Sequence, residues 1–95
     1  MSILPSIFSA GGYVVFFWSN EGNEPIHVHI AKGQPTANST KVWLLEKGGC
    51  ILAHNKSKIP RHDLDVIMDM ISAHYFVICD KWKKFYCVED ISFYC

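Results

Sequence analysis

The chain has 95 residues, and its nine basic and nine acidic side chains leave no net charge at neutral pH. Hydrophobic residues make up 49% of it, which excludes a disordered chain, and the length allows one domain, residues 1–95. A domain that binds nucleic acid through its phosphates normally has a basic excess. The balanced charge therefore disfavours nucleic acid as the main partner, although it leaves room for a local basic patch.

The spacing of the cysteines and the composition of the first residues indicate the cellular compartment. None of the four cysteines forms a C-x-x-C pair of the kind found in zinc knuckles and thioredoxin-like sites. The segment Met1–Trp18 is apolar, but it lacks a basic start and Pro5 and the Gly11-Gly12 pair interrupt it. We therefore expect a cytoplasmic protein with reduced thiols and no membrane span.

The first half of the chain has the pattern of β-strands. Tyr13–Trp18 is a continuous run of β-branched and aromatic residues, and the turn formers Ser19–Pro25 follow it. Three further strands are expected at His27–Ile30, Lys41–Leu45 and Cys50–His54. Because brief turns join these segments, they predict an antiparallel sheet of three or four strands.

The second half changes to a helical period. Apolar residues recur at intervals of three and four, and we expect burial at five of them, namely Leu64, Ile67, Ile71, Ile78 and Trp82. The pattern predicts either one long helix over Pro60–Tyr86 or two helices that meet near Ser72–Tyr75. The fold class is thus α+β, with this helical segment packed on one face of the sheet. The tail Val88–Cys95 either adds an edge strand or packs without regular structure.

The segment Glu24-Pro25-Ile26-His27-Val28-His29 is the sharpest local feature. On a strand, His27 and His29 point to the same face, where two imidazoles can bind one zinc or similar transition ion. On the helical projection, His74 borders the sheet and is the candidate third ligand. The same histidines could instead serve as an acid and a base, or hydrogen-bond the loop Ser19–Glu24 and order it. As a binding surface, the candidates are His27, His29, His74, Asn20 and Glu24.

These residues resemble a known family. The aromatic strand, the polar turn and the Pro-x-His-x-His segment are similar to short bacterial proteins of domain of unknown function 4160. The similarity continues through Lys41–Leu44, the Pro60 helix start, His74 and Trp82, although Ile26 stands where the family has a second proline. The resemblance implies a gene beside that of a second small protein, in some members labelled a toxin–antitoxin pair.

The sequence supports two interpretations that belong to different classes of function. The first is a non-enzymatic module that binds a small protein partner, as a component of such a gene pair. Three tryptophans and four tyrosines favour it, because these residues often anchor interfaces. The second is a small hydrolase or ribonuclease dependent on His27 and His29, with or without a metal. No G-x-S-x-G, H-E-x-x-H or phosphate-binding glycine loop supports a specific enzyme class.

Overall fold

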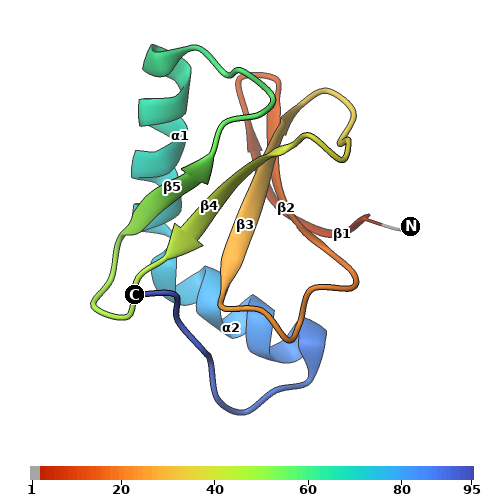
Figure 1. The fold of residues 1–95 in the computed structure, drawn as a ribbon, viewed down its shortest axis with the longest axis vertical. Helices are drawn as coiled ribbons and strands as arrows, with labels where there is room; N and C mark the ends of the chain where they lie inside the picture. Colours follow the sequence, from red (N-terminus) through yellow and green to blue (C-terminus); the bar gives the residue numbers. More distant parts are fainter. Residues whose placement is uncertain (1–2) are drawn as a thin grey trace.

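The computed structural model describes residues 3–95, and these residues form five strands and two helices (Figure 1). Met1 and Ser2, the start of the segment expected to carry no targeting signal, lie outside them. In chain order the elements are β1 (Ile3–Ala10), β2 (Tyr13–Trp18), β3 (His27–Lys32), β4 (Thr40–Leu44), β5 (Cys50–His54), α1 (Arg61–Ala73) and α2 (Tyr75–Tyr86). The α+β class is confirmed. Across the described residues, no helix is both long and apolar enough to cross a bilayer.

The sheet is an antiparallel meander in the order β1-β2-β3-β4-β5, so every strand pairs with its neighbour in the chain. The expected number of three or four strands was too low, because β1 carries Pro5 and two serines and did not read as a strand. An edge strand tolerates such residues, since one side of its backbone needs no partner. Its pairing with β2 is irregular around Ser6.

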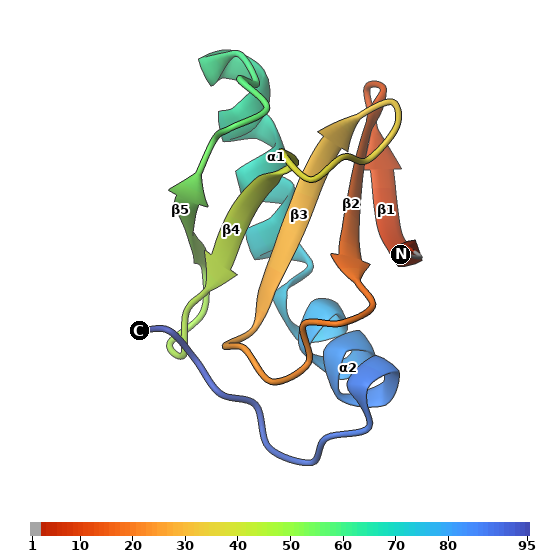
Figure 2. The same cartoon turned by 45° about the vertical axis from the view of Figure 1, so that its right-hand side comes forward.

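The helical segment consists of two helices that meet at His74. His74 leaves the helical backbone conformation, with φ −101° and ψ 18°, and its Nδ1 donates a hydrogen bond to the Met70 carbonyl oxygen at 2.8 Å. Of the two alternatives, the broken helix is therefore the one observed. In Figure 1 and Figure 2, α1 runs beside β4 and β5 and α2 crosses the end of the sheet.

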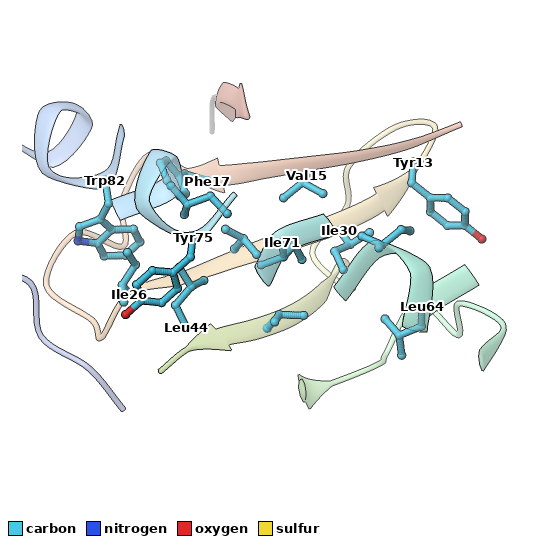
Figure 3. Close-up of a cluster of buried hydrophobic side chains, with 14 of the residues drawn as sticks. Tyr13, Val15, Phe17, Ile26, Ile30, Leu44, Leu64, Ile71, Tyr75 and Trp82 are labelled. Carbon is cyan, nitrogen blue, oxygen red and sulfur yellow. The ribbon is translucent and has the colours of Figure 1, made fainter. Parts of the chain in front are cut away.

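The core lies between the helices and one face of the sheet (Figure 3). Leu64, Ile67, Ile71, Ile78 and Trp82 are all buried, as the helical period predicted. They pack against inward-facing residues of the strands, including Val15, Phe17, Val28, Ile30, Val42 and Leu44.

The tail forms no strand. It follows α2, whose C-terminal capping residue Cys87 has a left-handed backbone conformation. The tail then runs along the end of the sheet. Backbone hydrogen bonds run from Ile26 N–H to the Ser92 carbonyl and from Glu46 N–H to the Cys95 carbonyl. The Tyr94 ring stacks on Trp43 with 4.8 Å between centroids. The tail thus packs against the start of β3 and the end of β4 without regular structure.

Candidate functional site

The site is a cluster of one carboxylate and two imidazoles at the start of β3. His27 and His29 lie two residues apart on the strand, and their ring centroids are 5.0 Å apart. Glu21, from the loop between β2 and β3, places Oε1 at 2.7 Å from His27 Nε2 and 2.8 Å from His29 Nε2. One carboxylate oxygen therefore bridges the two histidines.

Both histidines are held by aromatic neighbours. His27 lies between Trp43 of β4 and Trp82 of α2, with centroid distances of 5.6 and 5.4 Å. His29 stacks on Phe16 at 5.6 Å, its partner across the β2–β3 ladder. The two side chains are only 1% and 7% exposed. Packing therefore fixes both rings, and the cluster has little freedom on its strand side.

The hydrogen-bond partners indicate which ring nitrogens of His27 and His29 carry a proton. His27 Nδ1 donates to the Pro25 carbonyl oxygen at 2.9 Å, because a carbonyl can only accept. When Nε2 also donates to Glu21, His27 carries both ring protons and forms an ion pair with the carboxylate. His29 donates through Nε2, and within residues 3–95 no group hydrogen-bonds its buried Nδ1.

Burial and hydrogen bonding oppose each other in this cluster. Burial alone would raise the pKa of the Glu21 carboxyl, but the hydrogen bonds from His27 and His29 leave that pKa below its ordinary value. Burial lowers the pKa of His29, and the contacts with Glu21 only partly offset the effect. Glu21 is therefore ionised and His29 neutral near neutral pH.

The loop that carries Glu21 is clamped from a second side. The Tyr86 hydroxyl of α2 donates a hydrogen bond to the Trp18 carbonyl oxygen. Gly22 lies against the Tyr86 ring so closely that a Cβ atom would come within 2.5 Å of Cδ1. The loop is therefore fixed between α2 and the histidines, although it has no regular secondary structure.

A pocket of about 450 Å³ opens beside this loop. We call it the loop pocket. Its lining comes from the end of β2, the loop after it and the loop between β3 and β4, and consists of Trp18, Asn20, Glu21, Pro35, Thr36 and Ala37. Glu21 thus joins the buried cluster to an open surface. Neither histidine lines the pocket.

The other candidates from the sequence lie in different places. Asn20 is exposed at the loop pocket, and Glu24 pairs with Lys41 Nζ at 2.9 Å. His74 does not join the cluster, because its ring stacks on Phe8 at 5.0 Å, on the face of the sheet that the helices cover. His29 lies on the opposite face beside Phe16. The expected grouping with His74 is thus replaced by one with Glu21.

Sequence reasoning missed Glu21. A signal was present, because a hairpin loop that joins two paired strands returns to the start of the second strand. An acidic residue six positions before His27 therefore lies near both histidines. The side-chain direction that brings Glu21 onto the rings depends on the contacts with Tyr86, which the spacing does not show.

The fold and the site together define a small α+β domain with a buried carboxylate–histidine cluster beneath a loop pocket. Residues 12–83 match the family model described as Domain of unknown function (DUF4160). The match covers most of the chain, so the protein belongs to this family, as the sequence resemblance indicated. No curated protein and no solved structure matches the chain.

Proposed function

We propose that this protein is a cytoplasmic, non-enzymatic module that binds a small protein partner through the loop pocket. The observation that carries the proposal is the clamped loop at one wall of that pocket. A loop held in one conformation pays little ordering entropy when a partner binds. Binding groups in proteins are commonly presented on loops that a rigid scaffold positions.

The lining of the pocket suits a protein side chain. Trp18, Pro35 and Ala37 supply apolar surface, and Asn20 and Thr36 supply exposed polar groups beside it. Partly exposed tryptophans are frequent anchors of protein interfaces. A pocket with an apolar wall and a few polar groups is the common form of a recognition site.

The balanced charge of the chain favours a protein partner over nucleic acid. We propose further that the partner is the product of an adjacent gene, as a component of a toxin–antitoxin-type pair. Only the family resemblance supports this second step, and it is tested separately below.

The hydrolase or ribonuclease alternative has less support. An acid or base must come within hydrogen-bond reach of the substrate proton, directly or through one water. His27 and His29 are buried, and Glu21 is the one member of the cluster that lines the pocket. The histidines are therefore placed to hold the loop, which was one of the three roles that the sequence left open.

The test fills the pocket from the loop between β3 and β4. Ala37→Arg places a long side chain at the exposed wall, and Ala73→Arg places the same side chain at the exposed end of α1. The dissociation constant for the adjacent gene's product is measured by isothermal titration calorimetry. We expect Ala37→Arg to weaken binding by at least about ten-fold, because the arginine would occupy the pocket that a side chain of the partner fills in the complex. Ala73→Arg should have little effect.

Two results would contradict the proposal in different ways. If the adjacent gene's product does not bind the wild-type protein, the gene-pair step is wrong. If it binds Ala37→Arg as tightly as wild type while circular dichroism shows both to be folded, the loop pocket is not the binding site.

A further inference from the structure

The geometry points to a metal site formed by Glu21, His27 and His29 that takes a divalent transition ion such as Zn²⁺. This inference goes beyond partner binding and does not depend on it. One ligand atom from each residue lies within 4.8 Å of the other two. Imidazole nitrogens and a carboxylate oxygen are ligands that zinc and similar ions accept.

The strand presents the two histidines as a fixed pair. They occupy alternate positions of β3, so their side chains leave the same face of the sheet. Edge-to-face contacts with Trp43 and Trp82 hold the His27 ring, and stacking on Phe16 holds the His29 ring. Metal sites need ligands that are positioned before the ion arrives, and ligands on a packed strand meet this requirement.

The outer nitrogen of His27 has the partner that a metal ligand needs. Its Nδ1–H donates to the Pro25 carbonyl oxygen at 2.9 Å. This hydrogen bond fixes the tautomer and leaves the lone pair of Nε2 directed at the cluster. Ligating histidines in metalloproteins typically donate their other ring N–H to a carbonyl or carboxylate in this way.

The contact between His27 and Glu21 requires a bound cation. A neutral His27 would bring its Nε2 lone pair to within 2.7 Å of a carboxylate oxygen, so a cation, either a proton or a metal ion, must lie between them. His29 faces Glu21 through Nε2, so an ion there would leave the ring proton on Nδ1, and packing on Phe16 rather than an outer hydrogen bond would hold this ligand among the described residues.

The site can widen to admit an ion from the side of the loop. Ligand atoms around tetrahedral zinc are about 3.3 Å apart, given metal–ligand distances of about 2.0–2.1 Å. The present separations from Glu21 are 2.7 and 2.8 Å, so its carboxylate would move outward by about half an ångström. The Glu21 side chain is 20% exposed and lines the loop pocket. Three protein ligands leave a fourth position for water or a partner's group.

Zinc affinity tests the inference directly. Protein stripped with a chelator and then freed of it is titrated with ZnCl₂ in competition with a chromogenic zinc indicator. We expect one equivalent to bind and the melting temperature to rise, because an ion that binds only the folded state stabilises it. Glu21→Gln and His29→Ala should each lower the affinity by at least about 100-fold, since loss of an outer partner alone costs about 10–100-fold. His74→Ala should bind as wild type.

Controls separate this site from other sources of metal binding. Co²⁺ should give visible absorption bands of tetrahedral nitrogen and oxygen coordination, without the near-ultraviolet band of a thiolate ligand. Glu21→Gln tests the site even if His29→Ala fails to fold, because Glu21 lies on the loop. The zinc titration contains no partner protein, so its outcome is distinguishable from failure of the proposed partner surface. Absence of a bound equivalent, a thiolate band, or unchanged affinity in folded Glu21→Gln would overturn the inference.

Discussion

The two faces of β3 are buried to nearly the same extent, but in different ways. Val28 and Ile30 face the helices and are 0% exposed. His27 and His29 alternate with them and are buried as well. Apolar side chains of the helices cover the first pair, whereas a loop carboxylate and aromatic rings, one of them Trp82 of α2, contact the second.

The difference shows what each kind of burial requires. Apolar burial stabilises in proportion to area and needs no partner of a particular geometry. A buried imidazole stabilises only if its polar atoms are paired, and His29 is paired at one nitrogen alone. The helix-facing side of the strand therefore stabilises the fold more, and the histidine side stabilises it less while it fixes Glu21 and its loop.

The largest effect is expected on the apolar side. Ile30→Ala should lower the free energy of unfolding by about 2–5 kcal/mol, because it removes buried methyl groups and leaves a cavity. Urea denaturation followed by circular dichroism measures the change. A loss below about 1 kcal/mol would mean that the helices repack to fill the space left by Ile30. The helix-facing side would then not contribute more stability than the histidine side.

The histidine side should show a smaller effect. His29→Ala should cost about 1–3 kcal/mol, because it removes the hydrogen bond to Glu21 and the packing on Phe16. His29→Leu keeps most of the volume and removes the unpaired nitrogen, so it should cost less than His29→Ala. Both variants are compared by urea denaturation with a chelator present. If His29→Leu costs as much as His29→Ala, the hydrogen bond to Glu21 and not the packing of the ring accounts for the loss.

The smallest effect is a pH dependence that belongs to the histidine side alone. The folded-state pKa of His29 is below 6.5, chiefly through burial, and that of Glu21 is below 4.5 because hydrogen bonds from the histidines outweigh burial. The unfolded chain therefore takes up these protons first as pH falls. Stability should be fully present above about pH 6.5 and decrease below it, with a further loss below about pH 4.5.

The control for this dependence is His29→Leu, measured over the same pH range in chelator. It retains His54, whose pKa is also lowered, chiefly by burial, so the difference from wild type reports His29 and its contact with Glu21. A wild-type stability that rises on acidification from pH 6.5 would contradict the assignment of His29 as neutral in the folded protein.

Much of the fold could be predicted from local pattern. The run Tyr13–Trp18 became β2, and the strands expected at His27–Ile30, Lys41–Leu45 and Cys50–His54 became β3, β4 and β5 with small shifts at their ends. These predictions were confirmed because the apolar periodicity that distinguishes strands from helices is a property of residues close together in the sequence. Residues 3–10 did not carry that pattern, since an edge strand need not be apolar or free of proline.

The sequence by itself determined the strands β2 to β5, the buried face of the helices, the family and the pairing of His27 with His29 on one face. The tertiary structure alone decided that Glu21, and not His74, completes the cluster. His74 does border the sheet, but its neighbour is Phe8 on the helix-covered face. Helical period fixes which side of a helix faces a sheet. It does not fix which face of the sheet that helix covers, because this depends on contacts between residues far apart in the chain.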